Sequence, residues 1–211
     1  MKLYIANQTC SQAVQIIANE LGLDLDLVHF YVFDRTTSDG SDFAAVNPLL
    51  YVPVLALESG GDDRLTETIT ILSYLADTHP EAGLIPAAGT LDRAKFDQLL
   101  TFTATEIAQK HIPLMRRLMT DEGSAWTRNK LIKAYTVLND RLAQAPFIAG
   151  NRFTVSDAYV WTTMWHERSG TDISHLDNLA TWKQRMDGRP VVKALREEAA
   201  MAAEHKTIKT A

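Results

Sequence analysis

The chain has 211 residues, which is enough for one large or two small domains. Its hydrophobic share of 46% and charged share of 22% are typical of a globular protein with a buried core. With 21 basic and 26 acidic side chains, its formal charge of -5 removes the attraction to phosphate backbones that drives most nucleic-acid binding. No apolar run is long enough for a membrane helix, and residues 1–10 lack the features of a signal peptide. We therefore expect a cytoplasmic protein with neither nucleic-acid nor membrane partners.

The first part of the chain alternates between predicted strands and helices. Apolar runs predict strands at 2–6, 27–33 and 53–57 and a very short one at 64–65, while helical spacing predicts helices at 10–21 and 67–78. A strand, a helix and a strand within the first 33 residues favour right-handed parallel pairing. The polar stretch 34–42 is expected to be a mobile loop, and 59–63 a glycine and aspartate turn.

A domain boundary is expected at residues 79–90, which contain two prolines and two glycines. Beyond it the pattern is wholly helical, with predicted helices at 91–119, 124–143, 155–167, 179–186 and 191–204. The sequence therefore predicts an α/β domain at 1–79, a linker at 80–90 and an all-α domain at 91–211.

Cys10 is the single cysteine, and it stands where a strand has ended and a helix begins. The free amide groups of a first helical turn can lower a thiol pKa, so Cys10 is a candidate nucleophile or sulfur partner. The alternative is a small hydrophobic side chain in the core. One thiol cannot build a disulfide within the chain or a thiolate-rich zinc site, and no two of the six histidines have the spacing of paired ligands on one helix face. We expect no metal site.

Two further features suggest a peptide-like ligand with charged ends. Pro53 stands at the start of a predicted strand, where a proline removes a backbone hydrogen-bond donor from the sheet. A cis bond between Val52 and Pro53 would explain it, because this bond would turn the backbone of Val52 outward to pair with an extended peptide. Thr66, Glu67 and Thr68 precede an apolar helical run and could bind a carboxylate with free amides and hydroxyls. The alternative for this second group is a plain helix cap.

Short motifs along nearly the whole chain resemble the bacterial glutathione S-transferases of the beta class. They are MKLY with Cys10 and Ser11, AVNP at 45–48, VPVL at 52–55, LTETITILSYLAD at 65–77, ATEI at 104–107 and FTVSDAY at 153–159. The resemblance implies a thioredoxin-like domain followed by a helical domain, the glutathione S-transferase fold. It also implies a homodimer with glutathione as its co-substrate.

Carried over position by position, the resemblance assigns a glutathione site. Cys10 matches the cysteine that faces the glutathione sulfur, Val52 the residue whose backbone pairs with the cysteinyl part, and Pro53 the cis-proline. Glu67 and Thr68 match the pair that holds the γ-glutamyl end. Arg35 matches a basic position that can reach the glycine carboxylate.

The sequence departs from the family at several ligand-site positions. Family residues near the ligand are replaced at Thr101, Ala108, Gln109, Gln15 and the run Leu49, Leu50 and Tyr51. A tryptophan that walls the family's second-substrate pocket becomes His166, with Trp165 beside it. His111, one turn beyond Ala108, is a further candidate for that pocket, and its alternative is a solvated or capping side chain. Thr154 and Asp157 have the form of a capping box, for which we expect a structural role only.

The leading hypothesis is a glutathione-dependent transferase that conjugates glutathione to small, largely apolar electrophiles. One alternative is a thiol transferase or disulfide reductase in which Cys10 forms a mixed disulfide, which a second glutathione would have to resolve because the chain has no second cysteine. Another is a binding protein that keeps the fold without turnover, since fold alone does not establish function.

Overall fold

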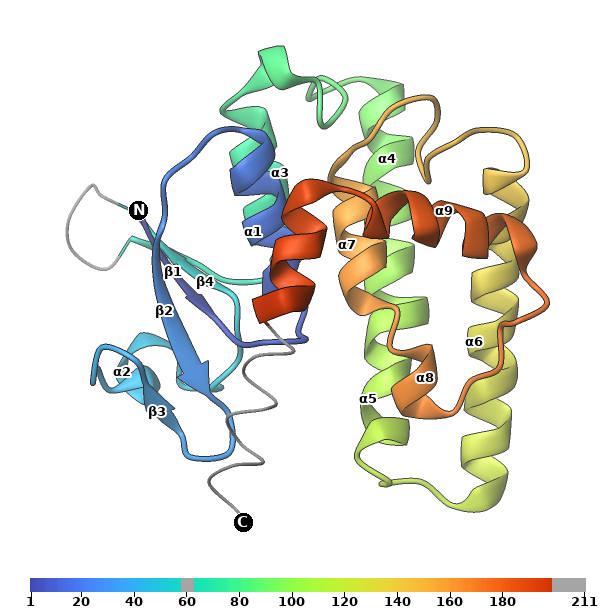
Figure 1. The fold of residues 1–211 in the computed structure, drawn as a ribbon, viewed down its shortest axis with the longest axis horizontal. Helices are drawn as coiled ribbons and strands as arrows, with labels where there is room; N and C mark the ends of the chain where they lie inside the picture. Colours follow the sequence, from blue (N-terminus) through green and yellow to red (C-terminus); the bar gives the residue numbers. More distant parts are fainter. Residues whose placement is uncertain (58–62, 199–211) are drawn as a thin grey trace. The chain divides into compact units, whose positions relative to one another are not determined.

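The computed structural model describes residues 1–57 and 63–198. The chain divides into two compact units (Figure 1): Met1–Leu75 together with the described residues from Met186 on, and Ala76–Arg185. This division differs from the expected one, because the described end of the chain groups with the first unit. Most of the turn expected at 59–63, and the end of the helix expected at 191–204, lie outside the described residues.

The described part of the first unit contains a five-stranded sheet in the order β3-β2-β1-β4-β5. Its strands are β1 (Lys2–Ile5), β2 (Asp26–Tyr31), β3 (Thr36–Thr37), β4 (Val54–Ala56) and β5 (Arg64–Leu65). β1 and β2 run parallel with Lys2 opposite Asp26, as the strand, helix and strand pattern predicts. The other three pairings are antiparallel.

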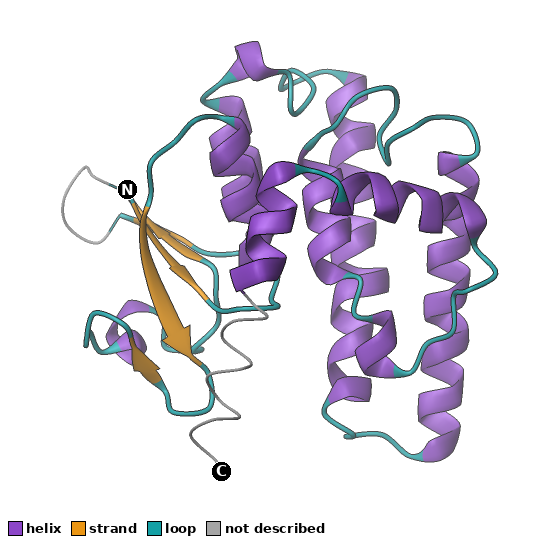
Figure 2. Ribbon diagram, viewed as in Figure 1, coloured by secondary structure: helices purple, strands orange, loops and turns teal. Residues whose placement is uncertain are grey.

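Helices cover both faces of this sheet (Figure 2). Side chains alternate between the faces of a strand, so Tyr4 points to one face of β1 and Leu3 to the other. On the Tyr4 face, a core cluster is closed by Phe43 from the short helix α2 (Phe43–Val46), which the sequence did not predict. The longer helices are α1 (Ser11–Glu20) and α3 (Thr68–Asp77), and residues 190–198 are also helical.

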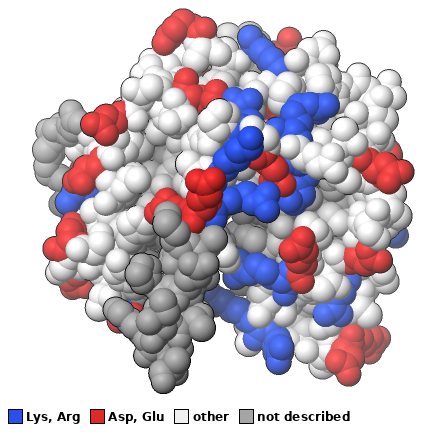
Figure 3. Space-filling model, viewed as in Figure 1, with Lys and Arg blue, Asp and Glu red and all other residues white. Residues whose placement is uncertain are grey.

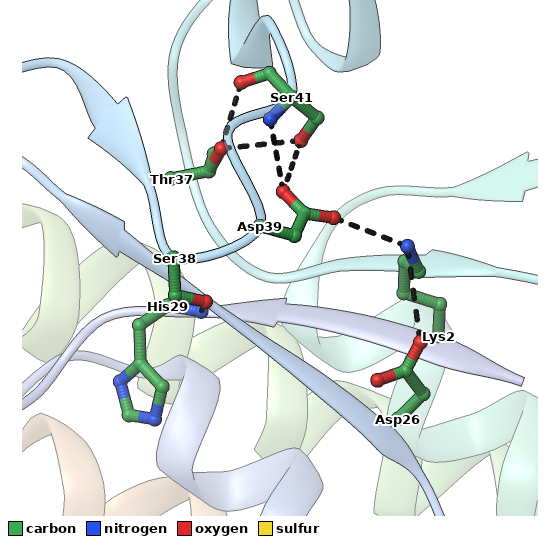
Figure 4. A network of polar contacts seen from close by, with 7 residues as sticks. All are labelled: Lys2, Asp26, His29, Thr37, Ser38, Asp39 and Ser41. Atoms are coloured by element: carbon green, nitrogen blue, oxygen red, sulfur yellow. Dashed lines mark hydrogen bonds and ion pairs between the residues drawn. The ribbon is translucent and has the colours of Figure 1, made fainter.

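The stretch expected to be a mobile loop at 34–42 is held by a polar network (Figure 4). Asp39 accepts hydrogen bonds from the amide and hydroxyl of Ser41 at 3.0 and 2.6 Å and from the Lys2 ammonium at 3.1 Å. These donors, the Ser41 hydroxyl first, hold the pKa of Asp39 well below its usual range. Thr37 donates to the Ser41 carbonyl at 2.7 Å, which secures β3 beside the network. The polar side chains of this stretch bind one another, so their polarity does not indicate a mobile loop.

The second unit is helical apart from its connections. It contains η1 (Pro80–Ala82), α4 (Leu91–Phe102), η2 (Thr103–Ala108), α5 (Gln109–Met115), α6 (Asp121–Leu142), α7 (Val155–Thr163), α8 (His166–Ser169) and most of α9 (Asp177–Asp187). The helix expected at 91–119 is therefore three segments, of which η2 is π-helical. The helix expected at 155–167 is also broken, because Met164 leaves the helical conformation with ψ of 63°.

Asp157 organises the start of α7 from a fully buried position. Its carboxylate accepts hydrogen bonds from the amides of Ile148 and Thr154 at 2.9 and 3.0 Å, and from the Trp182 indole at 2.9 Å. The Thr154 hydroxyl also donates to it at 3.0 Å. Thr154 and Asp157 form the capping box that their spacing predicts, and the same carboxylate fixes α9 through Trp182.

His111 lies at the centre of a second buried network. Its Nδ1 is 2.8 Å from the Ser169 hydroxyl and its Nε2 is 2.8 Å from the Tyr135 hydroxyl, so it links α5 to α6 and α8. Burial, with smaller contributions from the charges of His166 and Arg168, lowers the pKa of His111 to about 3. The imidazole is therefore neutral at neutral pH.

Acidic and basic side chains are mixed over the face shown in Figure 3. Arg93 forms ion pairs with Asp77 at 2.6 Å and with Asp97 at 2.8 Å, which secures the connection between α3 and α4. In the described part of the chain, no helix has both the length and the apolar character needed to cross a membrane.

We predict that His111 makes the protein sensitive to mild acid. Its pKa is about 3 in the folded chain, against about 6.5 for an ordinary histidine, so below about pH 6.5 the unfolded chain binds a proton that the native chain excludes. The free energy of unfolding should fall by up to about 1.4 kcal/mol per pH unit in this window. His111→Gln should lack this loss. The difference in free energy of unfolding between parent and variant, measured by urea unfolding, should therefore be smaller at about pH 5 than at about pH 7.

Tyr135→Phe is the matched control, because it removes the hydrogen-bond partner and keeps the imidazole. It should be less stable than the parent at both pH values and retain the parent's slope. If His111→Gln has the same slope as the parent, the acid sensitivity has another source.

Candidate functional site

Cys10 stands at the start of α1, and its sulfur lies beside the backbone of a distant segment. The thiol donates to the carbonyl oxygen of Val52 at an Sγ–O distance of 3.7 Å. The hydroxyl of Thr68 also forms a hydrogen bond with this thiol. The three residues come from three places in the chain, and we call them the Cys10 cluster.

The expectation of a lowered Cys10 pKa is wrong in this structure. Burial raises the pKa of the Cys10 thiol and outweighs the hydrogen bond from Thr68, which lowers it, and the nearby charge of Glu67 raises it further. The amides of the first turn are also occupied: Ser11 N donates to the Thr9 hydroxyl at 3.3 Å and Gln12 N to the Thr9 carbonyl at 3.2 Å. At neutral pH Cys10 is therefore a protonated thiol.

Thr9 is a site residue that the sequence analysis missed. Its hydroxyl binds the Ala6 carbonyl at 2.7 Å and contacts the Ser11 hydroxyl at 2.7 Å, while Ser11 in turn accepts from Ala6 N at 3.1 Å. A threonine just before a helix is a usual capping residue, so the signal was present. Thr9 fixes the turn that presents Cys10.

The Val52–Pro53 peptide bond is cis, the isomer that the sequence predicts. Pro53 is buried, Val52 is half-buried, and β4 begins at the next residue, Val54. Before them, Asn47 fixes the turn: its amide donates to the Tyr51 carbonyl at 2.8 Å and its side-chain oxygen accepts from Leu49 N at 3.2 Å. Residues 47–53 thus form an ordered segment next to Cys10.

The start of α3 has an exposed acid beside a buried hydroxyl. Glu67 has φ of 63°, a left-handed conformation that is uncommon for residues other than glycine, and its carbonyl accepts from Ile71 N at 3.0 Å. Its side chain is exposed. Thr68 is only 6% exposed and reaches Cys10. An ammonium and a carboxylate of one ligand could therefore bind at adjacent residues.

Arg35 is not joined to the Cys10 cluster. It lies in the turn after β2 with φ of 54°, and its amide donates to the Tyr31 carbonyl at 2.8 Å. Its side chain is exposed, and no hydrogen bond or ion pair connects it to Cys10, Val52 or Thr68. The role of Arg35 stays a prediction.

The three residues expected to line a second-substrate pocket have different surroundings. His111 is buried in the network described above, so it is neither solvated nor a cap. Trp165 packs edge-on to His111, with ring centroids 6.3 Å apart. Only His166 lines the cavity of about 410 Å³ in the second unit, and Lys183, which the sequence analysis did not single out, lines it as well.

Three of the positions that depart from the family lie along the α4–η2–α5 region. Thr101 is exposed near the end of α4, Ala108 ends η2 and is buried, and Gln109 begins α5 and is exposed. None of them carries a charge. At these positions the chain therefore offers a ligand no charged or imidazole group.

Comparison with known proteins agrees with this arrangement. The family model for the glutathione S-transferase N-terminal domain matches residues 9–78. Glutathione S-transferase GstA of Escherichia coli O157:H7 is 34% identical over 194 residues, covering 92% of this chain and 96% of that protein.

Solved structures give the same result. A sphingomonad glutathione S-transferase complexed with glutathione has a TM-score of 0.87 and 34% identity, and covers 95% of this chain and 99% of its own. The beta-class enzyme of Sphingomonas chungbukensis has a TM-score of 0.85 and 34% identity, and covers 94% of this chain and 98% of its own. With a thioredoxin-like sheet unit, a helical unit and relatives that match over nearly their whole length, this chain belongs to the glutathione S-transferase family.

Proposed function

We propose that the chain conjugates glutathione to small apolar electrophiles, with glutathione bound at the Cys10 cluster. The observation that supports this most strongly is the contact between Cys10 Sγ and Val52 O at 3.7 Å. It brings together the thiol and the backbone proposed to pair with the cysteinyl part of glutathione. Thr68 adds the start of α3 to the same group.

Each end of the γ-glutamyl group has a chemically matched partner at the start of α3. The exposed Glu67 carboxylate pairs with the ammonium, and the hydroxyl and amide of Thr68 bind the carboxylate. Val52 supplies its backbone to the cysteinyl unit, and the cis bond to Pro53 sets the direction of that backbone. Arg35 remains our candidate for the glycine carboxylate.

The raised pKa of Cys10 favours conjugation over disulfide exchange. A protonated thiol is a poor nucleophile, and it is a donor that can stabilise a second sulfur as its thiolate. We propose that Cys10 donates its S–H to the glutathione sulfur. The glutathione thiol loses its proton to solvent, and its sulfur forms a bond to the electrophilic carbon while the leaving group departs with its electron pair.

We also propose that the protein is a two-fold dimer, the assembly that the family resemblance implies. The contact would use α3 and α4, where Tyr74 is 37% exposed and Leu91 is 70% exposed. A two-fold axis lets each chain use the same surface residues in the contact.

The first prediction concerns Cys10, to which any thiol label must attach because it is the single cysteine. The rate of its alkylation by iodoacetamide should rise at a higher pH in the native protein than in the urea-unfolded chain, because burial disfavours the thiolate. Thr68→Val should move the native profile higher still, and Thr68→Ser should not. A native profile at or below the unfolded one would contradict the protonated thiol.

The second prediction tests the glutathione site by titration calorimetry. Glu67→Gln should weaken glutathione binding by about 10- to 100-fold, since a charge-assisted contact contributes about 1.5 to 3 kcal/mol. Gln109→Ala, the control in the helical unit, should bind within about twofold of the parent. If Gln109→Ala loses binding and Glu67→Gln does not, the ligand is held elsewhere.

Turnover is then tested with a generic aryl halide on the parent and on Cys10→Ala. The parent should conjugate it, and Cys10→Ala should lose less of this activity than of disulfide exchange. Glutathione binding by the parent without conjugation of any aryl halide would instead indicate a binding protein.

The third prediction concerns assembly. Light scattering at micromolar concentration should give a mass of about twice 23.5 kDa. Leu91→Asp should shift the protein toward the monomer, because it places a charge in an apolar contact. Trp126→Asp, at an exposed aromatic residue on α6, is the control and should leave the mass unchanged. A monomeric parent rules out the dimer.

A further inference from the structure

None of the residues proposed to bind glutathione lines the cavity in the second unit. It has a volume of about 410 Å³ and is walled by the end of α7, by α8, by residues 170–174 and by α9. Met164, Ile173, Leu176 and Leu179 give it an apolar lining. A cavity of this volume, mainly apolar with a few polar groups, is of the kind that binds small molecules.

The tautomer of His166 is fixed by its neighbour. Its Nδ1 lies 3.2 Å from the carbonyl oxygen of Met164, which can only accept, so Nδ1 carries the hydrogen. A neutral imidazole with hydrogen on Nδ1 has its lone pair on Nε2. Burial lowers the pKa of His166. The hydrogen bond to Met164 and the charge of Glu167 oppose this, and the charge of Lys183 adds the smallest contribution, which lowers it. The cavity lining therefore includes a hydrogen-bond acceptor, His166, and a cation, Lys183.

The other charged groups of the lining argue against a permanent anion as ligand. Glu167 Oε1 is 3.8 Å from His166 Nε2, and its side chain is 84% exposed. Asp172 accepts the amide of Ser174 at 3.0 Å. A carboxylate ligand would meet both of these acids. A neutral molecule with one donor group would meet the neutral imidazole instead.

We propose that this cavity binds a small neutral phenol, with the hydroxyl donating to His166 Nε2 and the ring against the apolar lining. The Lys183 cation, which belongs to the same lining, favours the partial negative charge that builds on the oxygen as it donates. A phenol carries such charge more readily than an alkyl alcohol, and its flat ring suits the apolar walls. The proposal does not depend on glutathione binding or turnover.

The test is titration calorimetry of the full chain, without glutathione, against para-cyanophenol and para-methoxybenzonitrile. The two probes have nearly the same shape, and only the first has a hydroxyl to donate. The phenol should bind one molecule per chain, and the methyl ether should bind about three- to tenfold more weakly, the range expected for one lost hydrogen bond. His166→Phe should abolish this difference, and His175→Phe, at an exposed histidine outside the lining, should preserve it.

A second variant tests the location of the phenol. Ala180 lines the cavity from an exposed position on α9, so Ala180→Leu should reduce its volume without disturbing the core. It should weaken binding of both probes by at least about threefold. The proposal is overturned if the parent shows no saturable phenol binding, or if it binds phenol and ether equally. It is also overturned if His166→Phe still discriminates between them, or if Ala180→Leu binds both like the parent.

Discussion

A single buried carboxylate holds the helical unit together. Asp157 is surrounded by donors from three places in the chain, and its two oxygens accept the amides of Ile148 and Thr154, the Thr154 hydroxyl and the Trp182 indole. An unpaired carboxylate at such a depth would cost several kcal/mol, so the surrounding segments must adopt the positions that supply these donors. α7 can therefore begin in the interior. Met164, which follows its last residue, and His166, which begins α8, both line the cavity.

In the first unit, electrostatics act on a thiol. Burial raises the pKa of Cys10, so the thiol stays protonated and is a poor nucleophile. Thr9 accepts the amides of Ser11 and Gln12 at the start of α1, and of the first amides it is that of Cys10 itself that bonds to the sulfur. Cys10 is left to donate to Val52 and to meet the Thr68 hydroxyl. In the proposed mechanism, binding and chemistry are then separate: the chain's own sulfur stays protonated, and the sulfur that reacts is that of glutathione.

Local patterns predicted the regular elements well, because helix and strand periodicity is a property of neighbouring residues. They could not predict that η2 would widen into a π-helix or that Met164 would end α7, since neither place has a glycine and both depend on packing. Local patterns singled out Cys10, Val52 and Thr68, the family resemblance assigned them to one site, and the structure brings them together. The sign of the Cys10 pKa shift could not be predicted, because it depends on burial and on the occupied amides. The sequence around His111 did not indicate that this side chain is buried, since its hydrogen-bond partners Ser169 and Tyr135 are far from it in the chain.

The division into units has a consequence for how the protein forms during synthesis. The helical unit, Ala76–Arg185, is one uninterrupted segment, so all of its contacts can be made while the last residues are still in the ribosome. The first unit is discontinuous: Glu20 of α1 pairs with Arg189, and His29 of β2 lies 3.5 Å from Glu198. The part of the chain that is made first is therefore completed last. A nascent chain truncated before Arg189 lacks both of these closing contacts, although it already contains every residue proposed to bind glutathione.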